Sequence, residues 1–193
     1  MNLSRPLLLA SNSPRRKELL AGLGFKFEVK VKEVNEDFPE HLKRAEVAEY
    51  LASHKADAYQ HDLENEVLIT ADTIVCLGEG ILNKPADYKE AFEMLSALSD
   101  TAHEVITGVC ICSKEQKLVF HDVTTVYFKK LTEEEIDYYI RLYKPFDKAG
   151  AYGIQEWIGM IGIERIEGSY FNVVGMPVQK LYGHLKTLGL ISS

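Results

Sequence analysis

Residues 11–16 combine hydroxyl and guanidinium side chains at a point where a strand is expected to end and a helix to begin. The run reads Ser-Asn-Ser-Pro-Arg-Arg and follows the apolar segment Leu7–Ala10. Ser13 before Pro14 is typical of a helix start, with serine as the N-cap and proline at the first helical position. Backbone N–H groups and the positive end of the helix dipole attract anions there, and two arginines add donors that suit phosphate oxygens. The segment therefore predicts an anion site, and the alternative is an ordinary capped helix with solvated arginines.

Two carboxylates are candidates for binding a divalent metal ion. Asp72 lies inside the apolar, strand-like run 67–77, where a carboxylate costs free energy unless it is paired or binds metal. Glu36, in the acidic turn 35–39, is the natural second ligand if a hard cation is present. The alternative for Asp72 is a buried side chain that caps a turn or pairs with one arginine.

Two lysines and one glutamine could contact the remainder of an anionic ligand. Lys55 shares a helical face with apolar neighbours, so it either extends along that face to solvent or points into a site. Lys84 follows an expected hairpin, and it indicates a binding site only when it is considered together with Lys55. Gln155 ends the glycine-containing run 147–155, and its amide can offer a donor and an acceptor to a base edge. The alternative for that run is a bent strand.

The elements expected around these residues alternate between strand and helix early in the chain, and strands pair directly later. Strands are expected over 7–10, 25–31, 67–77, 104–112 and 118–129. Helices are expected from 14 to near Gly22 or Gly24, and over 40–60, 87–98, 132–144 and 177–189. Residues 150–174 are expected to form strands and tight loops. The pattern, with about five helices and six or seven strands, predicts an α/β fold with a mixed, twisted sheet flanked by helices.

Composition limits the class of protein. The 193 residues are 46% hydrophobic and contain no low-complexity block, which predicts one globular domain over residues 1–193. A net charge of −7 argues against a broad nucleic-acid surface but allows a small anionic substrate in a local basic cluster. The first apolar run is too short for a secretory signal or a membrane span, so we expect a cytoplasmic protein. Cys110 and Cys112 should share one side of a strand, and reduced structural thiols are favoured over metal or redox use.

Taken together, these segments resemble the Maf family of nucleotide pyrophosphatases. Members carry Ala-Ser-x-Ser-Pro-Arg-Arg near the start, then Ala-Asp-Thr, then Lys-Ala-Gly-Ala-Tyr-Gly-Ile-Gln, and all three motifs occur here in order, at 10–16, 71–73 and 148–155. The resemblance extends from Leu7 to about Leu188. It implies a fold akin to that of inosine triphosphate pyrophosphatases, with two lobes around a deep cleft and commonly a homodimer. It also implies hydrolysis of nucleoside triphosphates to the monophosphate and pyrophosphate, with Mg²⁺ or Mn²⁺ as the cofactor.

The resemblance further implies roles for individual residues. The metal-binding positions map onto Glu36 and Asp72, and Asp72 is the expected proton acceptor for the attacking water. The residues expected to hold the triphosphate are Ser11, Arg16, Lys55 and Lys84, and the two lysines are also counted as catalytic. The residues that match positions associated with base choice, in the subgroup acting on dTTP and UTP, are Arg15, Thr73 and Gln155.

Two departures from the family pattern bear on substrate preference. Asn35 stands where an acidic residue is often found, and Glu156 follows Gln155 where many members have glycine. Two other functions stay open: a pyrophosphatase for methylated or damaged nucleotides, and a nucleotide-sensing regulator of cell division. Gln155 favours pyrimidine substrates, because an amide can pair with the O4 and N3–H edge of uracil or thymine and discriminate against cytosine.

Overall fold

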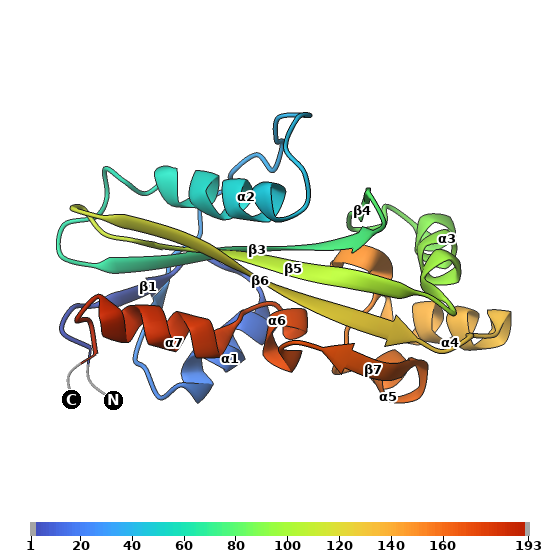
Figure 1. Cartoon of the computed structure of the whole chain (residues 1–193). Coiled ribbons are helices and arrows are strands. Elements are labelled where there is room, and N and C mark those ends of the chain that lie inside the picture. Colours follow the sequence, from blue (N-terminus) through green and yellow to red (C-terminus); the bar gives the residue numbers. More distant parts are fainter. Residues whose placement is uncertain (1–2, 192–193) are drawn as a thin grey trace. The chain divides into compact units, whose positions relative to one another are not determined.

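A mixed β-sheet runs through the computed structural model, which describes residues 3–191 (Figure 1). Its strands are β1 (Leu7–Leu9), β2 (Glu28–Val29), β3 (Val67–Leu77), β4 (Gly80–Leu82), β5 (Ala102–Cys112), β6 (Lys117–Phe128) and β7 (Ile163–Glu167). They lie in the order β2-β1-β3-β5-β6-β7, and β4 pairs with β3 beside this path. β1 is parallel to β2 and β3, whereas β4 and β7 are antiparallel to β3 and β6. The predicted α/β class with a mixed sheet is confirmed.

The order of helices and strands along the chain is close to the predicted order. They are α1 (Pro14–Gly22), α2 (Ala45–Asp57), α3 (Tyr88–Leu98), α4 (Glu133–Tyr143), the 3₁₀ helix η1 (Ala149–Ala151), α5 (Trp157–Gly162), α6 (Tyr170–Val174) and α7 (Val178–Thr187). No helix within residues 3–191 is long and apolar enough to cross a membrane.

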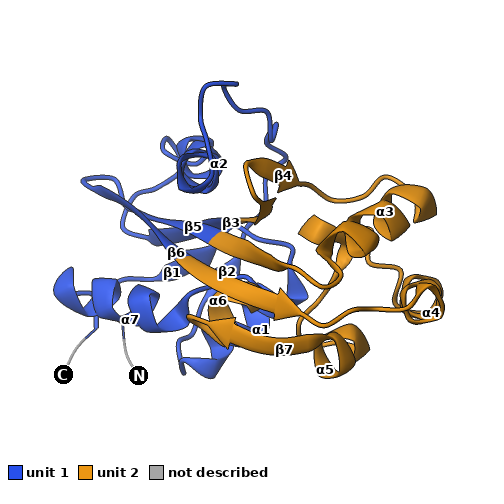
Figure 2. Cartoon of the chain, turned by 45° about the vertical axis from the view of Figure 1, so that its right-hand side comes forward, with its two compact units in different colours: residues 1–72, 107–122, 175–193 blue, residues 73–106, 123–174 orange. Residues whose placement is uncertain are grey.

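The chain divides into two compact units (Figure 2). Unit 1 comprises residues 1–72, 107–122 and 175–193, and unit 2 comprises residues 73–106 and 123–174. The chain passes from one unit to the other after residues 72, 106, 122 and 174, so neither unit is a continuous segment. Two units agree with the two lobes that the family resemblance implies, and a cleft between them stays a prediction.

In unit 1 the sheet lies between helices on both faces, with α1 and α7 on one face and α2 on the other (Figure 1). Because successive strand residues point to opposite faces, the apolar runs of β1, β3 and β5 supply both cores. The α1 and α7 side includes Leu7, Leu9, Leu20, Ile69, Val109, Leu181 and Leu185. The α2 side includes Leu8, Ala52, Ala56, Leu68, Cys110 and Cys112. The two cysteines therefore share one face, as predicted.

Helix α2 is seated directly against the sheet. A Cβ atom on Gly108 of β5 would lie only 2.2 Å from the carbonyl oxygen of Ala48 in α2, so glycine is required by the close approach of the two backbones. Further along the helix, the buried Thr70 Oγ1 of β3 donates a hydrogen bond to the carbonyl oxygen of Ala52 at 2.6 Å. These two contacts fix the helix that carries Lys55.

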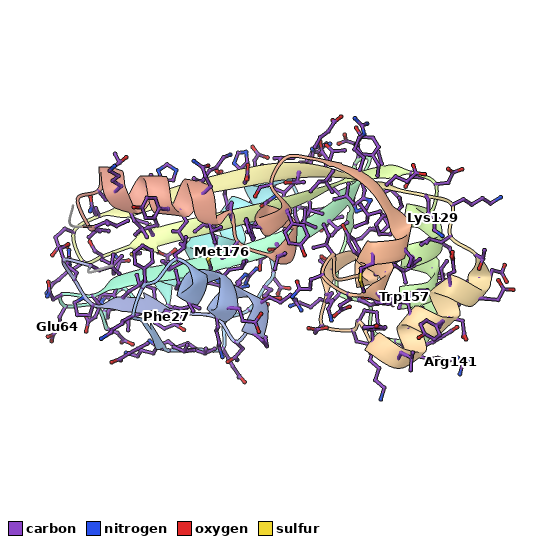
Figure 3. All side chains as sticks on the ribbon, turned by 90° about the horizontal axis from the view of Figure 1, so that it is seen from below. Phe27, Glu64, Lys129, Arg141, Trp157 and Met176 are labelled. Carbon is purple, nitrogen blue, oxygen red and sulfur yellow. The ribbon has the colours of Figure 1, made fainter. Side chains whose placement is uncertain are left out.

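In unit 2, helices α3 and α4 pack against each other, and η1 packs on α3. The predicted capping box of α4 is present, with Thr132 and Glu135 each accepting a hydrogen bond from the other's backbone N–H group. Trp157, labelled in Figure 3, is the first residue of α5. Its ring centroid lies 4.8 Å from that of Tyr138 in α4. Unit 2 therefore combines these helices with β4, β7 and parts of β3, β5 and β6 (Figure 2).

Four expectations about elements need correction. The strand expected over 25–31 is only Glu28–Val29, because its partner β1 is three residues long and β2 is an exposed edge. The helix expected over 40–60 begins at Ala45, since Arg44 has a left-handed φ of 50° that no helix interior accepts. Pro177 is the N-cap of α7 instead of its first residue. Residues 150–174 contain two short α-helices, α5 and α6, as well as β7, and α5 lies so close to the preceding chain that a Cβ atom on Gly159 would be 1.8 Å from the Ile154 oxygen.

Candidate active site

The site begins where β1 ends and α1 starts. β1 and β3 are parallel with Leu9 opposite Ile69, so the chain leaves β1 close to the middle of β3, where Asp72 lies. Ser11 is buried, and its Oγ accepts a hydrogen bond from the Ser13 N–H group at 3.2 Å. Ser13 Oγ in turn accepts from the Arg16 N–H group at 3.4 Å, which is the predicted N-cap contact. The local sequence therefore folds into the helix start that was expected.

Arg16 turns back from this helix onto two backbone carbonyl groups. Its Nε donates to the Gly175 oxygen at 2.9 Å and its Nη1 donates to the Ala71 oxygen at 2.8 Å. Desolvation lowers the pKa of Arg16 from its ordinary value, the Asp72 carboxylate acts in the opposite direction, and Arg15 lowers it further. Arg16 is thus a fixed guanidinium beside Asp72, and an anion bound nearby would relieve its repulsion with Arg15.

Lys55, in the last turn of α2, joins the two predicted carboxylates. Its Nζ donates to Glu36 Oε1 at 2.7 Å and to Asp72 Oδ1 at 2.5 Å. The Lys55 and Asp72 side chains are 17% and 13% exposed, whereas Glu36 is 48% exposed. Lys55 therefore points into the site instead of extending to solvent, and all three residues belong to unit 1.

The donor set of this cluster fits a hard divalent cation. Glu36 and Asp72 each present an oxygen to one position of positive charge, which is the Lys55 ammonium in this structure. No cluster of three or more His, Cys, Asp or Glu residues that could hold a metal ion occurs within residues 3–191. Mg²⁺ is commonly held by one or two carboxylates, with phosphate oxygens and water completing its shell. Two carboxylates match that pattern better than they match an all-protein metal site.

The turn that carries Glu36 is ordered by its neighbours. The Asn35 side-chain amide donates to Asp37 Oδ2 at 2.5 Å, and Asn35 Oδ1 accepts from the Asp37 N–H group at 3.1 Å. Asn35, which departs from the family pattern, therefore folds over the turn and binds Asp37. The substitution leaves Glu36 directed at Lys55.

Three further predicted residues lie in unit 2, whereas Arg15 is half-buried in α1 of unit 1. Thr73 follows Asp72 in β3 and is half-buried, whereas Lys84 and Gln155 are exposed. Gln155 borders an open groove of about 430 Å³ whose other walls include Met160 and Tyr170. The backbone N–H of Gly150 donates to the Asn83 oxygen at 3.2 Å, so the loop that carries Lys84 is joined to the segment that leads to Gln155.

The sequence pattern did not identify the side chains that contact Glu156, next to Gln155. Tyr139 of α4 and the nearly buried Lys148 both contact Glu156, the residue after Gln155. A signal was present, since Glu156 was noted as a departure from the usual glycine. The sequence pattern could not show that Tyr139 donates a hydrogen bond to Glu156, because Tyr139 lies in α4, which is distant from Glu156 along the chain.

The amino-acid sequence of this chain is similar to those of a described family. The family model "Maf-like protein" matches residues 6–188. A protein of Phocaeicola vulgatus named "dTTP/UTP pyrophosphatase" is 54% identical over 184 residues, covering 94% of this chain and 95% of that protein. Proteins with the same name from Parabacteroides distasonis and Bacteroides fragilis are 53% and 52% identical, covering 93% and 97% of this chain and 94% and 98% of their own.

A likeness to a solved structure is weaker. The "Structure of a HAM1 protein from Coxiella burnetii" is 19% identical, with a TM-score of 0.40 over 64% of this chain and 73% of that chain. A likeness at this level supports no argument about the fold or the site.

Proposed function

This chain belongs to the Maf family, and we propose that it hydrolyses dTTP and UTP to the nucleoside monophosphate and pyrophosphate. The broader activity, nucleoside triphosphate pyrophosphatase, follows from the family and from the name of relatives that share about half of its residues. The choice of pyrimidine nucleotides and the chemical steps are the further content of the proposal.

The observation that carries the proposal is the Lys55 ammonium held between Glu36 and Asp72. A triphosphate brings several negative charges, which must be neutralised before a water molecule can approach phosphorus. Lys55 contacts Asp72, and Arg16, in the first turn of α1, contacts the carbonyl oxygen of Ala71, so unit 1 brings two cationic side chains to neighbouring residues of β3 within an acidic protein. This local charge favours the phosphate groups of the substrate.

We propose that Glu36 and Asp72 hold Mg²⁺ or Mn²⁺ when the substrate binds. Such an ion supplies charge neutralisation on the phosphate oxygens and lowers the pKa of a bound water. The two carboxylates are suited to it because their oxygens already converge on one cation. Without metal, Lys55 offsets part of the charge of the two carboxylates, and it can move to phosphate oxygens when the metal is present.

The remaining steps are assigned to side chains of this chain. Asp72 is assigned the role of accepting a proton from the water that attacks the α-phosphorus, because its carboxylate can act as a general base once Lys55 moves to phosphate oxygens. Arg16, Lys55 and Lys84 stabilise the charge of the departing pyrophosphate. Two carbonyl contacts hold Arg16 in place before substrate arrives, which reduces the reorganisation needed during the reaction. Ser11 and the α1 N-terminus contribute hydrogen bonds to phosphate oxygens.

Base choice is assigned to Arg15, Thr73 and Gln155. Gln155 is exposed and borders a groove, so its amide is accessible to a ligand. An amide can donate to O4 and accept from N3–H of uracil or thymine, and the cytosine edge reverses both requirements.

We further propose that the two units act as one domain, since the chain crosses between them repeatedly. The homodimer and the cytoplasmic location stay predictions, and light scattering checks the first.

The test is a measurement of pyrophosphate and monophosphate release from dTTP, UTP, CTP, GTP and ATP. Each substrate is assayed with Mg²⁺, with Mn²⁺ and with a chelator, and excess metal is then added back. The proposal expects release from dTTP and UTP that chelation removes and metal restores. Tight triphosphate binding without turnover would overturn it in favour of a nucleotide-sensing role.

A further inference from the structure

The hydroxyl group of Tyr139 joins the two residues that flank Ile154 and Gln155. The Gly153 N–H group donates to Tyr139 Oη at 3.0 Å, and Tyr139 Oη donates to Glu156 Oε2. Tyr139 is fully buried, and both burial and the Glu156 carboxylate raise its pKa, so the hydroxyl keeps the proton it donates. One group therefore fixes the backbone before Gln155 and the side chain after it.

Lys148 holds the same carboxylate from a second direction. Its side chain is 9% exposed, and its Nζ lies 3.2 Å from Glu156 Oε1 and 2.7 Å from Asp147 Oδ1. Burying a lysine is costly unless its charge is paired, so these two carboxylates account for its charge within unit 2. A Cβ atom on Gly153 would lie 2.9 Å from Glu156 Cδ and 3.2 Å from Lys148 Cε. The lysine and glutamate thus pack directly on Gly153.

Ala151 and Tyr152, which precede this segment, are also fixed by their surroundings. Ala151 has a φ of 58°, a left-handed conformation that costs free energy for a residue with a Cβ atom. Such a conformation persists where surrounding contacts over-determine it. The next residue, Tyr152, has its hydroxyl 2.7 Å from His103 Nε2 of β5, and both rings are buried. The chain that leads to Gln155 is therefore fixed in position.

We propose that Tyr139, Lys148 and Glu156 form a positioning cluster that directs Gln155 and so sets the discrimination between uracil and cytosine nucleotides. The inference rests on the proposed function, because it concerns the base that Gln155 contacts. The Gln155 side chain is itself exposed, so its direction depends on the backbone on either side. None of the three cluster residues needs to touch the substrate, and they act through Gln155.

The first test compares Glu156→Ala and Glu156→Gln with a matched control, Glu135→Gln. Glu135 also pairs with a lysine in unit 2, at 2.8 Å from Lys129 Nζ, and its side chain is 27% exposed against 22% for Glu156. The readout is the ratio of kcat/KM for UTP to kcat/KM for CTP. We expect Glu156→Ala to lower this ratio about tenfold, the usual effect of misplacing one hydrogen-bonding group. Glu156→Gln keeps an acceptor for Tyr139 and should lose less, and Glu135→Gln should match the unmodified chain.

A double-mutant cycle with Gln155→Ala separates positioning from a general loss of structure. If Glu156 acts through Gln155, then Glu156→Ala lowers the ratio only in the presence of Gln155 and has no effect on the ratio in the Gln155→Ala chain. An equal reduction in both backgrounds, or no reduction in either, would overturn the inference. A merely structural role would lower turnover of UTP and CTP alike and leave their ratio unchanged.

Hydrogen exchange at the Gly153 amide gives a measurement that needs no substrate. This amide donates to Tyr139 Oη, so its exchange should accelerate in Glu156→Ala and stay unchanged in Glu135→Gln. Unchanged exchange in Glu156→Ala would refute the positioning cluster. If the unmodified chain hydrolyses neither UTP nor CTP, the proposed function has failed, and exchange at Gly153 still decides whether the cluster holds the segment.

Discussion

Replacing Gly108 by alanine should move the helix that carries Lys55. A Cβ atom at this position would lie 2.2 Å from the Ala48 oxygen, 2.3 Å from the Ala48 carbonyl carbon and 2.7 Å from the Glu49 nitrogen. All three are backbone atoms of α2, so no side-chain rotation relieves the overlap. Restoring ordinary contact distances requires α2 to shift by roughly 1 Å, and overpacking of this kind costs about 1–3 kcal/mol of unfolding free energy.

The shift reaches catalysis because Lys55 lies in the last turn of the same helix. A displacement of about 1 Å in a catalytic group can lower the rate about 100-fold. Gly108→Ala should therefore lower the melting temperature by about 5 °C and kcat/KM for UTP by about 100-fold. The matched control is Gly183→Ala in α7, where an added Cβ meets no atom within 4 Å, so stability and activity should be kept. Unchanged melting and activity in Gly108→Ala would refute the close packing, and lowered melting with full activity would refute the positioning of Lys55.

Three further predictions concern single groups. Asp72→Asn should lower turnover by about 10²–10⁴-fold with an unchanged circular dichroism spectrum, and retained activity would remove Asp72 from its proposed role as the base. Burial lowers the pKa of His103 from 6.5 to about 4, so the unfolded chain takes up this proton first as the pH falls. The free energy of unfolding should then fall by up to about 3 kcal/mol as the pH is lowered from 6.5 to about 4. In His103→Gln, the urea midpoint of unfolding should fall less over the same pH range. The three cysteines are buried, and burial raises the pKa of Cys110 to about 12, so a thiol reagent should react only after denaturation; rapid labelling of the native chain would contradict this.

Local patterns allowed the sequence to predict much of the fold. The helix start at Ser13 and Pro14 depends on four neighbouring residues, and so does the capping box of α4 at Thr132. The long strand around Asp72 was clear because its apolar run is buried on both faces. The strand expected over 25–31 was wrong in extent, because the length of an edge strand depends on its partner and not on its own alternation.

The sequence pattern could not predict contacts between residues that are far apart along the chain. Arg16 was predicted to bind phosphate, but its anchor on the Gly175 oxygen is 159 residues away. The pairing of Lys55 with both Glu36 and Asp72 required three segments to meet, which spacing along one helix does not specify. The Tyr139 contact with Glu156 likewise joins a helix to a loop, and only the folded chain brings them together.

The position of bond cleavage tests the central claim most directly. UTP is hydrolysed by the chain in water enriched in ¹⁸O, with divalent metal present, and the products are separated and analysed by mass spectrometry. Attack at the α-phosphorus predicts one labelled oxygen in UMP and unlabelled pyrophosphate. Label in pyrophosphate, or release of orthophosphate with UDP, would contradict the account.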